Sequence, residues 1–489
     1  MKKVIASVLS VAMVAALAAG CTSNPTESTA ATGGDTEATE SEGGETSGDE
    51  TEESSEGEET TTKKEMTFGT GAEVITLMSF TDEVPKMVGQ YVSQKPEFGE
   101  KYTVKCTIIA TDGGAYQTAL DAALVAGGDT APDLYTAEAA FVLKYTQGDM
   151  AKFAATYKDL GIDVSQIESA GIAPYSVEIG TRDNEVVALG YQASGCAMIY
   201  RSSIAQAVFG TDDPAEIEKI CGAGTGTWDK YWEAAAKLKD AGYVAVSGGG
   251  DIWNACEKSA DTAWIVDGQL NIDPKREAYI DIAKQLKDNG WSNDTTAWQE
   301  GWFADMKKDS KVFAFFGPAW LINYTIGQHC GEGDASTAGD WRVTVPPVGF
   351  YWGGTWVLAS KYAAQASDEK KAAIAEFISW ITLDTSDTGL QYLWANGLMN
   401  ENGTKDTVAS SVVMAKSNGE LEFLGGQNMF DYFVPANDAA TGKLLTQSDE
   451  AINTIFRDQV RQYTAGEKTK DQAISDFKAQ VSQDLGIES

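Results

Sequence analysis

The sequence predicts an α/β protein whose main body folds into two lobes. Three observations carry this prediction. Short apolar runs with strand character alternate with helical segments along the chain. The body after residue 62 contains 427 of the 489 residues, which is too long for a single hydrophobic core. An export signal and an acidic spacer precede this body, and neither segment can add to a core.

Residues 1–20 are expected to form a signal peptide. The basic start Met1-Lys2-Lys3 is followed by an apolar run, Val4 to Ala19, that is short for a membrane span. The end of this run, Ala18-Ala19-Gly20-Cys21, resembles the bacterial lipobox, although Ala18 stands where Leu is usual. In that motif the cysteine is acylated and becomes the first residue of the mature chain. An ordinary secretory signal with an unrelated cysteine is the alternative.

Residues 21–64 are expected to form acylated Cys21 and a disordered tether. Positions 22–62 carry thirteen acidic residues, no basic residue and no large apolar side chain. Such a segment cannot bury enough apolar surface to fold. Even an uncharged flexible chain of this length would span about 35 Å, and charge repulsion extends it further. We therefore expect a leash between a membrane and a folded body.

Charge narrows the classes of ligand. The whole chain has a formal net charge of −35, of which the body carries −24. Nucleic acids and other polyanions are therefore not expected as partners, whereas neutral or cationic ligands remain open. After the signal segment no apolar run reaches the roughly eighteen residues of a membrane span, so a soluble body is expected.

Motifs for catalysis or metal binding are mostly absent from the sequence. The single histidine, His329, rules out two-histidine zinc sites, and we expect it at the surface or at a helix end. No phosphate-binding loop, nucleophile elbow or calcium loop is present, so neither a cofactor nor a metal is predicted. A carboxylate pair of the glycoside hydrolase type stays open, because acidic residues are abundant.

The cysteines after Cys21 carry little information. They are five in number, irregularly spaced, and contain no C-x-x-C motif. We expect mostly buried thiols, and a disulfide between Cys196 and Cys221 remains open.

Strands and helices are expected in a regular alternation at the start of the body. The runs 74–80 and 102–110 have the character of buried strands, a helix with a C-terminal glycine ends at Gly127, and residues 131–135 form a short strand. Ligands of open parallel sheets lie beyond the carboxyl ends of the strands. The loops after Phe80, Ala110 and Tyr135 are therefore expected to face a ligand. Further along, Thr227 is expected to cap a helix, 312–316 to form a strand, and 372–383 a helix.

The order of several segments resembles the extracellular solute-binding proteins of carbohydrate ABC transporters, the group that includes maltose-binding protein. The resemblance extends from Thr67 to about Leu485. It rests on Ser79-Phe80-Thr81-Asp82-Glu83, Tyr116-Gln117, Pro132-Asp133-Leu134, Gly195-Cys196-Ala197-Met198-Ile199-Tyr200-Arg201, Thr227-Trp228-Asp229, Phe316-Gly317-Pro318-Ala319-Trp320, Val345-Pro346-Pro347 and Gly353-Gly354.

This resemblance implies the two-lobe, type II periplasmic-binding-protein fold, with a hinge and a ligand cleft between the lobes. Residues 65–190 and 345–400 would form the first lobe, and residues 191–344 and 401–489 the second. It further implies a monomer without catalytic residues that delivers its ligand to the permease subunits of an ABC transporter. With the lipobox, it places the protein on the extracellular face of a Gram-positive cell membrane.

Aromatic residues favour a sugar as ligand. The chain has 13 tryptophans, and flat aromatic faces suit the apolar patches of pyranose rings. Trp320 follows a Gly-Pro turn after the expected strand 312–316, so a strand-end loop is expected to carry it. It resembles the stacking tryptophan of the family, and Trp253 occupies the place of an aromatic from the second lobe. Tyr351 and Trp352 precede a glycine pair at a strand end. We also expect Trp298 to flank the cleft or to pack a helix with Trp302, whereas the tryptophans in helical apolar patterns are expected in the core: Trp228, Trp232, Trp380 and Trp394.

Polar groups are expected to bind the sugar hydroxyls, because a buried hydroxyl needs a hydrogen-bond partner. Strand ends and the first crossover supply Asp82, Asp112, Glu138 and Gln192. The remaining candidates are Phe80, Tyr116, and Gln427 in a late segment that returns to the cleft in relatives.

The sequence thus predicts a cell-surface lipoprotein that captures a neutral carbohydrate, an oligosaccharide, for import. Two alternatives remain open at this point. One is a binding protein for a peptide, polyamine or other cation, which the acidic body favours, and the other is a surface carbohydrate-active enzyme.

Overall fold

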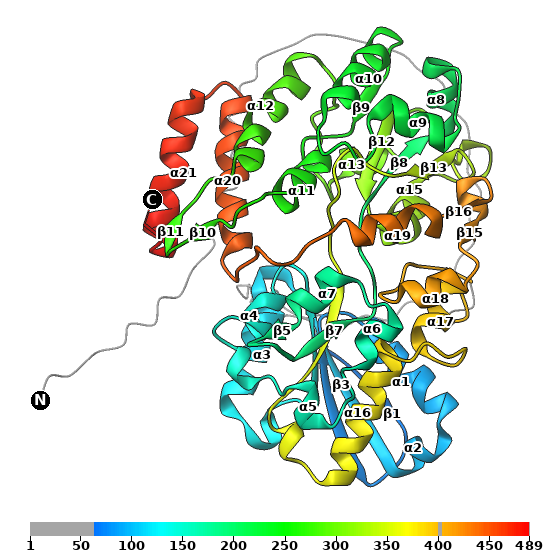
Figure 1. The fold of residues 1–489 in the computed structure, drawn as a ribbon, viewed down its shortest axis with the longest axis vertical. Coiled ribbons are helices and arrows are strands. Elements are labelled where there is room, and N and C mark those ends of the chain that lie inside the picture. The colour runs from blue at the N-terminus through cyan, green and yellow to red at the C-terminus, as the bar shows by residue number, and fades with distance from the viewer. Residues whose placement is uncertain (1–62, 400–402, 489) are drawn as a thin grey trace, which may run out of the picture.

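The computed structural model describes residues 63–399 and 403–488, which form two α/β lobes one above the other (Figure 1). The predicted signal peptide, Cys21 and nearly all of the tether lie outside the described residues. Each lobe is built on its own sheet, and helices cover the faces of both sheets. The predicted two-lobe α/β fold is therefore confirmed.

The first lobe contains a six-stranded sheet in the order β1-β3-β2-β4-β14-β7. Strand β2 runs parallel to β3 and β4, while β14 is antiparallel to both β4 and β7. The predicted strands correspond to β2, β3 and β4. The bounds are β1 Lys63–Phe68, β2 Glu73–Ser79, β3 Tyr102–Ile109, β4 Leu134–Glu138, β7 Ala188–Gly190 and β14 Thr355–Ala359.

Strand β1 was not predicted, and it includes Lys63 and Lys64, which the sequence analysis placed in the tether. It pairs antiparallel with β3 over its whole length, with Lys63 opposite Ile109 and Phe68 opposite Val104. Only Met66 and Phe68 pack against the core. The strand is thus held mainly by its ladder of hydrogen bonds, which an apolar pattern does not reveal.

The second lobe contains a four-stranded sheet in the order β13-β8-β12-β9. Strand β12 is buried at every position, as its continuous apolar sequence predicts for a central strand, and it pairs parallel with β9 and antiparallel with β8. The bounds are β8 Ala197–Arg201, β9 Val244–Val246, β12 Val312–Gly317 and β13 Trp341–Thr344. Two small strand pairs accompany this lobe, β10 Ile265–Val266 with β11 Gln269–Leu270 and β15 Glu420–Leu421 with β16 Gln427–Asn428, while β5 Thr181–Arg182 and β6 Glu185–Val186 pair in the first lobe.

Local signals explain where many helices begin and end. Asp213 caps α9 by accepting hydrogen bonds from the backbone of Ala215 and Glu216, and Pro214 opens its first turn. The helices associated with the first sheet are α1 Glu83–Gln94, α2 Pro96–Lys101, α3 Ala115–Ala126, α4 Val142–Thr146, α5 Tyr157–Leu160, α6 Gln166–Ala170, α7 Pro174–Ile179, α16 Asp368–Thr382, α17 Leu390–Ala395 and α18 Ser411–Ala415.

The predicted cap at Thr227 is wrong. Helix α10 begins at Asp229 after Trp228, and no side chain caps it. The preceding glycine loop is fixed from the other side, because the backbone N–H groups of Gly224 and Gly226 donate to the carbonyls of Pro346 and Pro347. The second lobe has α8 Ser202–Phe209, α9 Pro214–Cys221, α10 Asp229–Asp240, α11 Gly250–Lys258, α12 Pro274–Asp288, α13 Glu300–Ala304, α14 Ala319–Leu321, α15 Gly327–His329, α19 Phe430–Asp438, α20 Asp449–Thr464 and α21 Lys470–Leu485.

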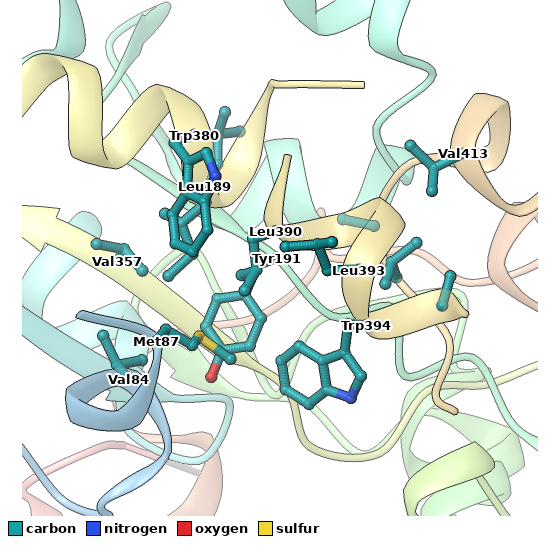
Figure 2. Packing of buried hydrophobic residues seen from close by; sticks show 14 of the residues in the cluster. Val84, Met87, Leu189, Tyr191, Val357, Trp380, Leu390, Leu393, Trp394 and Val413 are labelled. Atoms are coloured by element: carbon teal, nitrogen blue, oxygen red, sulfur yellow. The ribbon is translucent and has the colours of Figure 1, made fainter. Parts of the chain in front are cut away.

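Aromatic packing joins the late helices to the first lobe (Figure 2). The ring of Tyr191 stacks on Trp394 of α17 at 5.3 Å, and both lie with Leu189, Val357 and Trp380 in one core. The predicted structural role of Trp380 and Trp394 fits their burial, since only 4 % and 3 % of their surfaces are exposed.

The hinge consists of two chain crossings that pair with each other. Gly195 and Tyr351 form an antiparallel bridge, the N–H of Cys196 donates to the carbonyl of Phe350, and that of Trp352 donates to the carbonyl of Ser194 (both 3.0 Å). Gly195 is required here, since a Cβ at this position would lie 2.4 Å from Asn437 Oδ1 of α19. The lack of a side chain at Gly195 thus allows α19 to pack closely against this crossing.

Candidate functional site

Two adjoining cavities lie between the lobes, and we refer to them as chamber A and chamber B. Chamber A has a volume of about 740 Å³ and chamber B of about 710 Å³. They share Glu138, Trp298 and Gly353. Further residues of chamber A include Phe80, Asp82, Glu83, Lys86, Gln192, Trp320, Tyr324 and Met399; those of chamber B include Trp253, Lys258, Trp352, Glu450, Asn453 and Arg457.

Another cavity, of about 700 Å³, lies beside α1 and α16 on the first lobe. None of the predicted site residues lines it. The two chambers of the cleft are therefore the better candidate for the ligand site, because side chains from both lobes meet there.

Three tryptophans form a cluster between the chambers. The ring of Trp320 stacks nearly parallel to that of Trp298, with centroids 6.1 Å apart and an angle of 16°. Trp352 meets Trp320 edge-on at 5.0 Å, and its backbone carbonyl accepts a hydrogen bond of 3.3 Å from Trp320 Nε1. The three indoles come from three separate segments, and Trp298 is the most exposed of them at 49 %.

Trp320 does not lie on a loop, as the sequence analysis expected. It stands in the single turn of α14, because Pro318 ends β12 and starts the helix in extended conformation. The indole therefore projects from the first turn of a helix that follows a buried strand, which fixes its position firmly.

Gly353 allows the hinge segment to pass close to this cluster. Its φ is +78°, and a Cβ at this position would lie 3.3 Å from Trp320 Nε1 and 3.5 Å from Glu138 Oε1. A side chain would thus press against groups of both lobes. The carboxylate of Glu138 from the first lobe and the indole of Trp320 from the second lobe therefore both lie next to the backbone of Gly353.

Glu138 ends β4 and is the shared carboxylate of the two chambers. One of its oxygens accepts a hydrogen bond of 2.7 Å from the backbone of Ala140, and it makes no ion pair among the described residues. Burial raises the pKa of Glu138 to about 7; the Ala140 hydrogen bond opposes this rise and the charge of Glu450 adds to it.

The other carboxylates of chamber A already have partners. Asp82 forms ion pairs with Lys86 (3.0 Å) and Lys64 (3.1 Å); burial opposes its ionisation, but these pairs hold its pKa below the usual value. Glu83 accepts a hydrogen bond from the hydroxyl of Tyr191, and burial raises its pKa. Glu138 is consequently the carboxylate with most capacity left for a ligand.

Gln192 lies on the first crossover, where its side-chain amide donates to Asp406 Oδ2 at 2.9 Å. Burial raises the pKa of Asp406 to about 7, against hydrogen bonds from Thr407 and Gln192 that lower it. This pair joins the first crossover to the segment between α17 and α18. Gln192 is only 7 % exposed, so it presents little surface to chamber A.

Eight of the predicted site residues line the cleft: Phe80, Asp82, Glu138, Gln192, Trp253, Trp298, Trp320 and Trp352. Trp253 is the least accessible of the tryptophans among them, at 3 % exposed. Its ring packs against Tyr279 and Phe456 with centroids 4.8 and 5.3 Å away, so it forms the floor of chamber B.

Two predicted aromatic residues lie in the core instead. Tyr351 is fully buried, and its ring stacks on Tyr175 at 4.6 Å and 20°. Tyr116 is also fully buried, and its hydroxyl donates to the carbonyl of Thr136 at 2.6 Å. Both side chains fill space behind the sheet of the first lobe, so neither is accessible to a ligand in this structure.

Two predicted polar residues also lie outside both chambers. The side-chain amide of Gln427 binds the backbone N–H and carbonyl of Val343, at 2.8 and 2.7 Å, and so extends the edge of β13. Asp112 lies in an exposed turn of 3₁₀ helix before α3. A position at the end of a strand was therefore not enough to predict that a loop reaches the cleft.

Several residues that line chamber A were not predicted from the sequence. Glu83, Lys86 and Met87 follow Asp82 on the first turns of α1, and Tyr324 lies four residues after Trp320. Lys86 and Tyr324 each lie four residues after an identified residue, so helical spacing would have pointed to these two. Met399 and Thr404 flank a segment without strand or helix signals, so no pattern indicated them.

The histidine and the cysteines take structural positions. His329 stacks on Phe303 at 4.0 Å, and its Nδ1 lies 2.8 Å from the carbonyl of Thr325 in the preceding turn. All five cysteines in the described residues are buried free thiols, so Cys196 and Cys221 form no disulfide in this structure. Among the described helices, none has the length and apolar character of a membrane span.

Comparison with known proteins identifies the family. Residues 95–416 match the model of the bacterial extracellular solute-binding proteins. No match was found among curated proteins. A solved structure of an extracellular solute-binding protein of family 1 superposes with a TM-score of 0.66 at 18% identity, covering 84% of this chain and 99% of that one.

Two further solved structures are similar. The galacto-N-biose-/lacto-N-biose I-binding protein of an ABC transporter from Bifidobacterium longum, in complex with lacto-N-biose, has a TM-score of 0.60 at 17% identity and covers 86% of this chain and 99% of its own. An ABC transporter associated binding protein from B. animalis subsp. lactis, in complex with beta-1,6-galactobiose, has a TM-score of 0.55 at 19% identity, with 84% and 97% covered. With two lobes, a paired hinge and a cleft between them, the chain belongs to the bacterial extracellular solute-binding proteins.

Proposed function

We propose that this protein captures a neutral oligosaccharide in the interlobe cleft and delivers it to an ABC permease without altering it. The observation that carries the proposal is the meeting of Trp320 from the second lobe with Glu138 from the first at Gly353. An indole face suits the apolar side of a sugar ring, and a carboxylate accepts hydrogen bonds from the hydroxyl groups of the sugar. A ligand that touches both lobes stabilises their closed arrangement, which a permease can distinguish from the open one.

The solved relatives support a carbohydrate rather than another solute. Two of the three named above are complexes, one with lacto-N-biose and one with beta-1,6-galactobiose. The ion pairs of the cleft support a neutral ligand, because Arg457 pairs with Glu450 and Lys258 with Glu257. Such a surface offers hydrogen bonds of both kinds without a large net charge.

Titration calorimetry against a panel of neutral glycans tests this proposal. At least one glycan should bind, and binding should raise the melting temperature, since the ligand stabilises only the folded state. Conversion of that glycan to products by the pure protein would overturn the binding role, and a panel without any binder would overturn the choice of ligand.

We further propose that the chain is exported, acylated at Cys21, and held at the extracellular face of the membrane as a monomer on its acidic tether. Two or more acyl chains anchor a protein stably, and a flexible leash keeps its local concentration at a permease high. The lobe boundaries given from the sequence remain part of this proposal, except that α18 packs with helices of the first lobe. A Cys21→Ser protein should appear in the medium instead of the membrane fraction; retention at the membrane would contradict the anchor.

A cationic solute is the second candidate, and one observation favours it. Glu138 lacks an ion pair and lies beside an indole, and carboxylates combined with indole faces also recognise ammonium groups. Spermidine and short basic peptides should then bind more tightly as ionised Glu138 accumulates above pH 7, and Glu138→Gln should abolish the binding. Binding of spermidine that Glu138→Gln leaves intact would remove this candidate.

A further inference from the structure

Trp298 stands on the boundary between chambers A and B in a conformation that bulky side chains rarely adopt. It lines both chambers. Its φ is +68°, in the left-handed region where a Cβ collides with the backbone. A residue of this size remains there only where its surroundings impose the conformation, and such positions cluster at functional sites.

The loop that carries Trp298 is fixed by polar contacts behind it. The N–H groups of Asn293 and Thr295 donate to the carbonyl of Ser247, at 3.0 and 3.2 Å. Asp305, only 8 % exposed, accepts hydrogen bonds from Asn293 Nδ2 (2.8 Å) and Ser247 Oγ (2.7 Å). These hydrogen bonds attach the loop to the end of β9 and so stabilise the segment that leads to Trp298.

The indole of Trp298 is not needed to fill the core. Nearly half of its surface is exposed, whereas its neighbour Trp302 is 1 % exposed and donates to Asp251 Oδ1 at 3.0 Å. One face of Trp298 is covered by Trp320. The ring also lies near Trp302 and Trp352, with centroids 5.4 and 5.9 Å away. A strained backbone therefore presents a large apolar ring at the junction of two cavities, with nearly half of its surface still exposed there.

We propose that Trp298 separates the two chambers and thereby sets the length of oligosaccharide that the cleft accepts. This inference rests on the proposed function. A sugar chain stacked in chamber A meets the Trp298 ring at the boundary and cannot continue into chamber B. Removal of the ring joins the chambers, so that additional sugar units contact Trp352 and the polar groups of α20 in chamber B.

Two variants at this one position test the proposal. Glycine favours the left-handed region, so Trp298→Gly removes the ring and the strain together, whereas Trp298→Ala removes the ring and keeps the strain. The probes are maltose-type, cellulose-type and mannan-type oligosaccharides from disaccharide to hexasaccharide. Calorimetry should show wild-type affinity levelling off with chain length. In both variants affinity should continue to rise, by about tenfold beyond that length.

The outcomes separate this inference from the proposed function. If the wild-type protein binds one series and both variants level off at the same length as the wild type, Trp298 does not limit ligand length. A change in Trp298→Gly alone would assign the limit to backbone conformation and would also overturn the proposal. If the wild type binds no glycan at all, the proposed function fails first. Circular dichroism checks that each variant is folded.

Discussion

Replacing Glu138 with Gln removes a carboxyl group that its burial in the cleft keeps about half protonated at pH 7. Its pKa rises from 4.5 in the unfolded chain to about 7 in the folded protein, chiefly through burial. The folded state therefore binds this proton more tightly than the unfolded state. The free energy of unfolding must then fall as the pH rises from about 4.5 to about 7, and stay low above that.

The size of the effect follows from the two pKa values. Each pKa unit between the folded and unfolded states corresponds to about 1.4 kcal/mol. Ionised Glu138 therefore destabilises the folded protein by about 3 kcal/mol at high pH. Between about pH 5.5 and pH 8, where the protein is above its pI of about 4.3, the wild type should lose about 2 kcal/mol more than Glu138→Gln does. Urea unfolding of both proteins at the two pH values measures this difference, in which titrating groups that do not interact with Glu138 cancel.

Glu450 supplies the matched control. Its negative charge adds to the rise of the Glu138 pKa, so Glu450→Gln should reduce the pH dependence without removing it. Equal losses of stability in wild type and Glu138→Gln would refute the reasoning, because Glu138 would then titrate at the same pH in both states. A hydroxyl donor binds the ionised form better, so wild-type affinity for a bound glycan should also rise between these pH values, and that of Glu138→Gln should not.

Three further changes test the site. Trp320→Ala should weaken glycan binding by about 2 kcal/mol or more in calorimetry, whereas Trp232→Ala, which removes a partly buried indole of α10, should lower the melting temperature and leave affinity unchanged. Tyr351→Phe removes a buried hydroxyl that has no hydrogen-bond partner in this structure, so unfolding free energy should change by less than about 1 kcal/mol and affinity not at all; a clear loss of affinity would return Tyr351 to the site. Gly353→Ala places a Cβ 3.3 Å from Trp320 Nε1 in a left-handed backbone, and should reduce both stability and affinity by about 1 kcal/mol or more; wild-type values for both would show that the indole can move aside.

The strands and the main aromatic residue were predictable because their signals are local. A continuous apolar run bounded by turns gave β2, β3 and β12, and the Gly317-Pro318 turn after β12 pointed to Trp320. Glu138 was identified because it ends a strand of a largely parallel arrangement. Each of these inferences needs only the neighbouring residues.

The face that a side chain takes was not predictable in the hinge. Tyr351 and Trp352 are adjacent in an extended segment, so their side chains point in opposite directions. The structure directs Tyr351 into the core against Tyr175 and Trp352 toward Trp320. The sequence offers two aromatic residues at this point, and only the position of the second crossing decides which one reaches the cleft.

The hinge segment also explains how binding is coupled to lobe movement. Glu138 belongs to a strand of the first lobe and Trp320 to a helix of the second, yet both border the backbone of Gly353 in the crossing itself. A ligand that engages both groups therefore bridges the lobes beside the crossing that connects them. The ligand can favour the closed arrangement only by the difference in its affinity for the two arrangements. About 1.4 kcal/mol of that difference, roughly one charge-assisted hydrogen bond to Glu138, shifts the ratio of closed to open protein tenfold.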